Sequence, residues 1–335
     1  MLVAFFFLLF STSSFAYTGR VAIPSSNRDA LQIVTRSIDT DSSSSLHNSF
    51  IEFKTNPENL FADSDGCFCF PENDERFAYV QAFFHATEQV RSLNASFSNL
   101  KAGPVHIKIE LAKTKVGEAP HGAAHWSDNS VTIWYSQPLL DPSLLAHEIG
   151  HLAHGFILNQ DLSTFLIDPR KDLNGSFSQL NVIEGIANLF STFYTKDSLV
   201  GRYGYATAAI NLDAFLKLES LPTIKDVYDS RILSFSSMYP TTANLYRQLI
   251  ASPPLPGMLD QPEPYVASAV FTQPVWMAYF NLDQTQLLAA LACTLDKVSS
   301  ISSVNQFVLN LKSCSEAVPQ LKAFFDQEFG LRGFK

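Results

Sequence analysis

The sequence contains no cluster of Lys and Arg residues, and its formal charge is −9 at pH 7. Proteins that bind nucleic acids or anionic membrane surfaces concentrate positive charge, so this composition predicts neither kind of partner. The chain also has no glycine-rich phosphate-binding loop, no internal repeat, and no Ser/His/Asp or Cys/His arrangement for nucleophilic catalysis. These absences disfavour phosphate-binding enzymes, repeat scaffolds and serine or cysteine hydrolases.

Long hydrophobic runs are absent too. The apolar run at residues 2–10 is about half of the roughly 20 residues that a membrane-spanning helix needs. Small residues at Ser14 and Ala16 fit a signal-peptidase site, although no Lys or Arg precedes the run. We therefore expect a signal peptide at residues 1–16, cleavage after Ala16, and a secreted or periplasmic protein without a membrane span. A membrane anchor is the alternative.

Cysteine is scarce, with residues only at Cys67, Cys69, Cys293 and Cys314. An even number of cysteines suits an oxidising compartment, but four cysteines allow three disulfide pairings, between which the sequence does not decide. A bond between Cys293 and Cys314 would connect two C-terminal helices. Free buried thiols are the alternative, and the spacing of Cys67 and Cys69 disfavours a zinc knuckle.

The most informative motif present is His147-Glu148-Ile149-Gly150-His151. Residues four apart lie on the same face of an α-helix, so His147 and His151 can bind one metal ion. Glu148 would then lie beside the metal, where a carboxylate can take a proton from a water molecule that the metal has made acidic. The motif predicts a zinc (Zn2+) hydrolase.

The residues around the motif favour a helix over 141–155. Asp141 is a good N-cap, Pro142 suits the first helical position, and Gly155 is a candidate for the helix end. Apolar residues within the segment provide a packing surface for the helix. This context makes a chance match to the motif the weaker interpretation.

A catalytic zinc site needs a third protein ligand. The downstream acidic candidates are Asp161, Asp168, Asp172 and Glu184, and His154 is a further candidate. We favour Glu184, because it lies in an apolar segment predicted to be a helix, where Gly185 and Ala187 would allow close packing against the motif helix. His2Glu ligation leaves the fourth position for water.

The remaining pattern predicts an α+β fold. Alternating apolar residues predict strands at 105–112 and 131–135, and helical spacing predicts helices near 73–93 and 179–195. The polar segment 17–66 is expected to be a loosely ordered lead-in with only short strand-like runs such as 49–54, and to be either a linker or a pro-segment. Further helices are expected at 212–218, 239–251, 270–282, 284–298, 304–311 and 317–329.

With these motifs the chain resembles the gluzincin metallopeptidases, particularly the thermolysin and fungalysin groups, over residues 77–205. The resemblance implies that His147, His151 and Glu184 are zinc ligands and that Glu148 is the general base. It also implies a zincin-like two-lobed catalytic domain. The order of the predicted elements places this domain at residues 67–335, with a small mixed β-sheet lobe at 67–140, the motif helix at 141–155 and a mostly helical lobe at 156–335.

The same resemblance assigns roles outside the metal ligands. A strand before the motif binds substrate backbone in those families, and Ala123, Ala124 and Trp126, with the strand at 131–135, look similar to it. An extended peptide could add to its edge as another strand. Asn188 stands where the thermolysin group usually has an Asp that orients the first histidine; an amide oxygen can accept the same hydrogen bond without a charge.

The chain departs from that group in a second way. The thermolysin group has a downstream histidine that stabilises the oxyanion of the reaction, but no histidine follows His154 in this chain. A tyrosine hydroxyl can donate to developing negative charge, and Tyr203 and Tyr205 are the candidates. Arg202 and Tyr194 are alternatives.

The sequence therefore predicts an exported zinc metallopeptidase, an endopeptidase rather than an exopeptidase, since no acidic motif for binding an amino terminus is recognisable. Its partner would be a peptide or protein substrate. The alternatives are an exported zinc-binding protein of the same fold without activity, and a zinc hydrolase acting on a nonpeptide amide or ester. The oligomeric state is not indicated.

Overall fold

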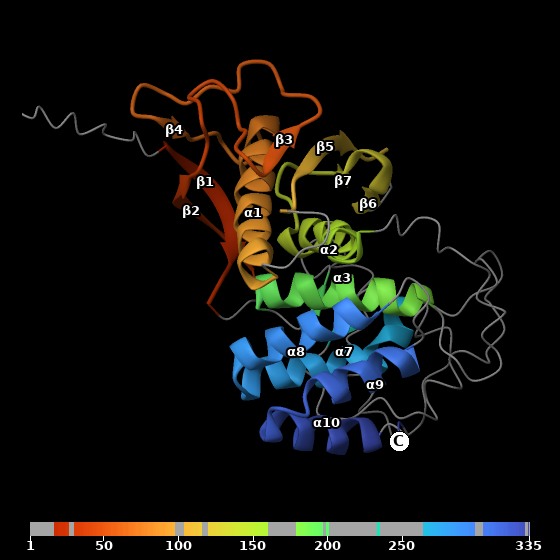
Figure 1. The fold of residues 1–335 in the computed structure, drawn as a ribbon. Coiled ribbons are helices and arrows are strands. Elements are labelled where there is room, and N and C mark those ends of the chain that lie inside the picture. Colours follow the sequence, from red (N-terminus) through yellow and green to blue (C-terminus); the bar gives the residue numbers. More distant parts are fainter. Residues whose placement is uncertain are drawn as a thin grey trace, which may run out of the picture.

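The computed structural model describes residues 17–26, 30–97, 104–115, 120–159, 179–196, 199–200, 233–234, 264–298, 304–331 and 334. The expected signal peptide at 1–16 and the expected helices at 212–218 and 239–251 lie outside these residues. So do Tyr203 and Tyr205, the two oxyanion candidates, and Arg202. The described part is a mixed α/β structure (Figure 1), in agreement with the α+β class, and the zincin-like two-lobed arrangement stays a prediction.

A four-stranded mixed sheet precedes the motif helix. Its strand order is β3 (Ile51–Phe53), β5 (Ile107–Lys113), β7 (Ser130–Tyr135) and β6 (His121–His125). The first three strands are parallel, and β6 runs antiparallel to β7 at the edge of the sheet. The strands predicted at 105–112 and 131–135 are confirmed as β5 and β7.

The segment at residues 17–66 differs from its prediction, because it contributes regular structure. Strands β1 (Tyr17–Pro24) and β2 (Leu31–Ile38) form an antiparallel pair, and β1 also pairs with the short β4 (Cys67–Phe68). Strand β3 belongs to the four-stranded sheet described above. The expectation of loose order was therefore wrong.

Polar residues in this segment form ordered turns, which explains why a polar composition does not mean loose order here. The buried side chain of Asn48 accepts hydrogen bonds from the backbone N–H groups of Phe50 and Ile51, each at 2.9 Å, and donates to Thr87 at 3.1 Å. Such side-chain to backbone bonds order a turn without apolar periodicity. A reading based on hydrophobic patterns cannot detect them.

The two helices that flank the sheet begin at acidic N-caps. In α1 (Glu75–Ser96) the N-cap Asp74 accepts a hydrogen bond from the N–H of Arg76, and in α2 (Pro142–Leu158) Asp141 accepts from the N–H of Ser143. The predicted start of α2 is thus confirmed. The predicted end at Gly155 was wrong, since α2 continues to Leu158 and is capped by Asn159 in the left-handed conformation.

Gly155 has a packing role inside α2. A Cβ placed on this residue would lie 1.9 Å from the indole ring of Trp126, which belongs to the short 3-10 helix η1 (Trp126–Asp128) after β6. A glycine in the sequence can signal either a helix end or a close approach. In this structure the glycine marks a close approach, because the indole of Trp126 packs directly against position 155.

The C-terminal part of the chain is helical. Below α2 in Figure 1 lie α3 (Gln179–Thr195), α7 (Pro264–Asn281), α8 (Gln284–Lys297), α9 (Val304–Cys314) and α10 (Pro319–Leu331). The pair β8 (Leu199–Val200) and β9 (Leu233–Ser234) is antiparallel. The helices predicted near 179–195, 270–282, 284–298, 304–311 and 317–329 are confirmed. Buried apolar side chains from the sheet, from α1 and α2, and from the C-terminal helices form one core.

The cysteine pairing is decided by the fold. Cys293 and Cys314 form a disulfide that connects α8 with α9, and Cys67 pairs with Cys69. The expectation that the first of these bonds joins two C-terminal helices is confirmed. A disulfide between segments separated in sequence stabilises the fold mainly by restricting the unfolded chain.

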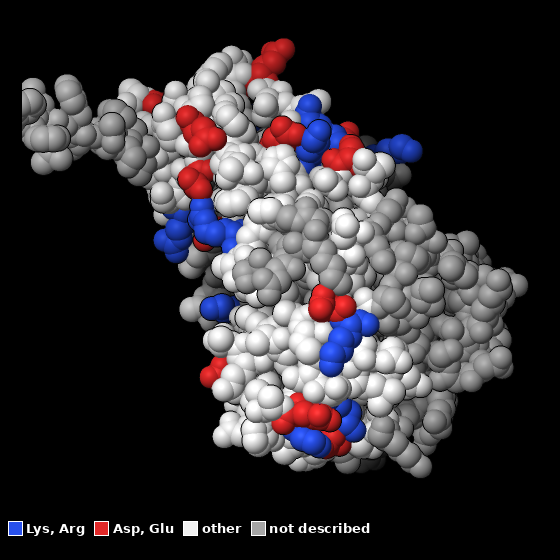
Figure 2. Space-filling view, viewed as in Figure 1, with Lys and Arg blue, Asp and Glu red and all other residues white. Residues whose placement is uncertain are grey.

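Charges on the face shown in Figure 2 are scattered in small groups, several of which contain both signs. Lys312 and Lys322 lie beside Asp326, at 3.0 and 2.5 Å, and Arg91 pairs with Asp39 and Glu88. Among the described helices, none has both the length and the apolar character needed to cross a membrane.

His85 supplies a pH-dependent contribution to stability. Its Nε2–H donates to the carbonyl of Ala22 at 2.7 Å, and its Nδ1 accepts from the hydroxyl of Tyr194 at 2.8 Å. Burial lowers the pKa of His85 to about 4, so the native protein holds the ring neutral while the unfolded chain protonates near pH 6.5. The hydroxyl of Tyr194, an alternative candidate for stabilising the oxyanion, is therefore used in a hydrogen bond to His85.

Stability is therefore expected to fall as the pH drops from 6.5 to 4, and His85 should account for about 3 kcal/mol of that loss. The loss occurs because only the unfolded state gains the proton in this window. Denaturant unfolding at pH 7 and at pH 4 measures it. A His85→Leu variant should be less stable at pH 7 and show a flatter pH dependence; an unchanged pH dependence would contradict the assignment.

Candidate metal centre

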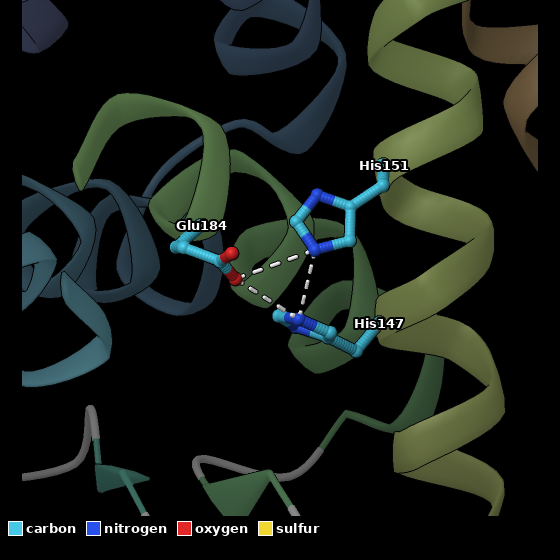
Figure 3. Close-up of side chains that lie close together, drawn as sticks. All are labelled: His147, His151 and Glu184. Atoms are coloured by element: carbon cyan, nitrogen blue, oxygen red, sulfur yellow. Dashed lines mark hydrogen bonds and ion pairs between the residues drawn. The ribbon is translucent and has the colours of Figure 1, made fainter. Parts of the chain in front are cut away.

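The two histidines of the HExxH motif lie one turn apart on the same face of α2. His147 and His151 point from successive turns of this helix toward Glu184 on α3, as Figure 3 shows. The Nε2 atoms of the two histidines are 3.1 Å apart. The Oε2 atom of Glu184 lies 3.2 Å from Nε2 of His147 and 3.3 Å from Nε2 of His151. These three residues form a buried group that can hold a metal ion.

Close packing of α2 against α3 makes this convergence possible. A Cβ on Gly150 would lie 2.9 Å from the backbone of Ala187, so the two helices approach more closely than a larger residue at position 150 would permit. The small residue Ala187 was expected to allow this approach. Gly185 was expected to help, but it faces Phe271 of α7. In addition, the hydroxyl of Ser191 donates to the carbonyl of Ser143 at 2.7 Å.

Asn188 orients the first histidine. Its Oδ1 accepts a hydrogen bond from Nδ1–H of His147 at 2.9 Å, and its side chain is 1% exposed. A neutral imidazole that carries its proton on Nδ1 has a lone pair on Nε2. The contact therefore fixes the tautomer in which Nε2 faces Glu184 and His151.

The electrostatics of the group favour an anionic Glu184. Burial disfavours its charge, but the neighbouring His151 and His147 outweigh that effect and lower the pKa of Glu184 to about 2. Burial also opposes protonation of His151, yet Glu184 raises the pKa of this histidine above its usual value. A carboxylate that stays ionised in a buried site needs a compensating positive charge nearby. A protonated His151 supplies such a charge in the absence of metal, and a cation held by the three side chains would supply it in its place.

Glu148 lies on the same helix but is not part of the three-residue group. It is 6% exposed, and burial raises its pKa, with His147 and His151 opposing that shift. Its side chain is directed to β6, since Cγ of Glu148 would be 2.5 Å from a Cβ placed on Gly122. A buried carboxylate of raised pKa beside a metal-binding group is suited to proton transfer.

The other predicted residues occupy different positions. Ala123 and Ala124 belong to β6, the edge strand above α2, and Trp126 packs against Gly155. Their role in substrate binding stays a prediction. His154 is buried, no described residue within hydrogen-bonding distance pairs with its ring nitrogens, and burial lowers its pKa to about 3. It does not belong to the three-residue group. The acidic candidates Asp161, Asp168 and Asp172 lie outside the described residues.

Two residues near the site were missed by the sequence analysis. Gln89 on α1 donates from Nε2 to the carbonyl of Ala146 at 2.7 Å, next to the first histidine. Gly122 adjoins Glu148. Neither carries a local signal, because a glutamine within a helix and a glycine before two alanines are common sequences. Only the packing of α1 and β6 against α2 brings them to the site.

Comparison with known proteins gives no family assignment: the chain matches no protein-family model and no curated protein.

Replacing Asn188 with alanine is expected to weaken metal binding by about 10- to 100-fold, because the orienting bond to His147 would be lost. Competition with a chromophoric chelator measures the affinity. Asn188→Asp keeps an acceptor and adds a charge, so it should bind at least as tightly as the wild type. An Asn188→Ala affinity equal to that of the wild type would show that the bond has no influence on the metal.

Proposed function

We propose that this protein is an exported zinc-dependent metallopeptidase that cleaves peptide bonds within extended chain segments. The observation that carries the proposal is the convergence of His147, His151 and Glu184 in one buried group with Glu148 beside it. Because no family assignment supports it, the proposal depends on the motif, the site geometry and the resemblance to gluzincins.

The spacing of the three ligand atoms is compatible with a tetrahedral zinc site. Zinc binds nitrogen and oxygen ligands at about 2.0–2.1 Å in tetrahedral sites, which places the ligand atoms about 3.3 Å from one another. The three observed separations are 3.1, 3.2 and 3.3 Å. Within the described part of the chain, Oε2 of Glu184 is buried and makes no hydrogen bond of acceptable geometry. A cation at the centre of the three atoms would satisfy it.

His147, His151 and Glu184 would hold the ion, leaving one position of a tetrahedral site open. When bound there, zinc supplies a Lewis acid that polarises a carbonyl and makes a water molecule more acidic. Glu148 takes the proton of the attacking water on its carboxylate and later delivers it to the leaving amine. Burial raises the pKa of Glu148, which makes its carboxylate a stronger base toward the water proton.

Strand β6 provides a position for the substrate. It is an edge strand of the four-stranded sheet and contacts α2. An extended peptide can add to the edge of a sheet through backbone hydrogen bonds, which hold it without selecting particular side chains. A peptide beside Ala123 and Ala124 would pass close to Glu148, since Gly122 on the same strand adjoins that residue. This placement favours cleavage inside a chain.

Export is supported by the cysteines. All four are paired as Cys67–Cys69 and Cys293–Cys314, and disulfides form and persist mainly in secreted or periplasmic proteins. Together with the expected signal peptide at residues 1–16, this pairing favours an extracytoplasmic location.

The proposal is tested by incubating the zinc-loaded protein with an unbiased peptide mixture and reading the products by mass spectrometry. The Glu148→Gln variant is the control for a contaminating peptidase. New termini within peptides that appear with the wild type alone would support an endopeptidase. Intact peptides from both proteins, with zinc bound, would overturn the proposal in favour of a nonproteolytic zinc protein or a hydrolase of nonpeptide substrates.

A further inference from the structure

Gly122 lies where β6 passes over the motif helix. It pairs with Ile133 of β7, and directly opposite residues of an antiparallel pair share one face of the sheet. Ile133 is 2% exposed and belongs to the core. Position 122 therefore faces the interior, toward α2.

The space beside Gly122 is filled by one side chain. A Cβ placed on Gly122 would lie 2.5 Å from Cγ, 2.7 Å from Oε1 and 2.8 Å from Cδ of Glu148. Nonbonded carbon atoms normally stay about 3.5–4.0 Å apart. The three nearest atoms all belong to Glu148, so a side chain at position 122 would displace that carboxylate first.

Backbone conformation does not explain the glycine. The described glycine with a positive φ is Gly66, at 75°, so the backbone of Gly122 is one that other residues can adopt. Position 122 has no room for a side chain. Glu148 occupies the space that a side chain at position 122 would need.

From these observations we infer that Gly122 is a positioning residue, which keeps open the space beside β6 in which the Glu148 carboxylate lies. This inference rests on the proposed function for its catalytic consequence. A base must lie within hydrogen-bonding reach of the proton that it takes, and a misplacement of about 1 Å can lower a rate by about 100-fold. Gly122 itself touches neither substrate nor metal in this role.

The first test is the Gly122→Ala variant, with Gly330→Ala as the matched control, because no atom lies within 4 Å of a Cβ placed on Gly330. We expect Gly122→Ala to lower kcat by about 10- to 100-fold, with KM and zinc content close to those of the wild type. Gly330→Ala should match the wild type in all three. A crystal structure of Gly122→Ala should show the Glu148 carboxylate moved away from β6; an unmoved carboxylate would overturn the inference.

A second variant keeps the inference testable if Gly122→Ala does not fold. Glu148→Ala removes all three atoms that the new methyl group would meet, so Gly122→Ala should be tolerated in that background. We expect the double variant to have the Tm of Glu148→Ala. A double variant that is unfolded, or whose Tm is lower by the same amount as Gly122→Ala alone, would overturn the inference. These structural and thermal readouts do not need peptidase activity, so they decide the role of Gly122 even if the proposed function fails.

Discussion

Replacing Glu148 with glutamine is expected to lower kcat/KM for peptide cleavage by about 100- to 10,000-fold while leaving zinc bound. The amide has nearly the same shape as the carboxylate but does not accept a proton at neutral pH. Glu148 is separate from the three-residue metal group, so the ligand set stays intact. Steady-state kinetics and metal analysis of the same preparation measure the two effects.

Glu58→Gln is the matched control, because Glu58 is exposed and distant in sequence from the site. It should leave both zinc content and kcat/KM unchanged. Loss of zinc from Glu148→Gln would show that this side chain contributes to metal binding. Full activity of Glu148→Gln would show that another group accepts the proton.

Replacing Glu184 with alanine is expected to lower zinc affinity by at least about 100-fold, more than the loss of an orienting contact such as that of Asn188. The variant loses the only anionic member of the group and one of three ligand atoms. Competition with a chelator measures the affinity. Activity should fall in parallel and return only partly at high zinc concentration.

Thermal unfolding gives an independent measure of the same loss. A ligand that binds only the native state raises its stability by mass action, so zinc should raise the Tm of the wild type and chelation should lower it. The Tm of Glu184→Ala should respond weakly to both treatments, whereas Glu58→Gln should respond like the wild type. A zinc-dependent Tm in Glu184→Ala equal to that of the wild type would contradict the role of Glu184 as a ligand.

The sequence predicted the local features of this protein well. The spacing of His147 and His151 places both side chains on one face of a helix regardless of what surrounds it, because the period of the α-helix is fixed. Asp141 and Pro142 specified the start of that helix for a similarly local reason. Alternating apolar residues specified β5 and β7. Glu184 was also identified from sequence, but only as the most suitable of several candidates.

Packing between distant segments decided the rest. The end of α2 could not be predicted, since Gly155 accommodates Trp126 from η1 and the helix continues to Leu158. The strands within residues 17–66 depend on the pairing of β1 with β2 and β4, and of β3 with β5. They also depend on polar turn contacts such as those of Asn48, which produce no apolar period. The roles of Gly122 and Gln89 exist only because β6 and α1 meet α2.

The chain by itself therefore determined which residues can bind a metal ion, because ligand chemistry and helical spacing are properties of neighbouring residues. The tertiary structure decided that Glu184 reaches His147 and His151, that Asn188 orients His147, and that Gly122 leaves room for Glu148. These contacts join residues on different elements, and their distances follow from how closely the helices and the edge strand pack.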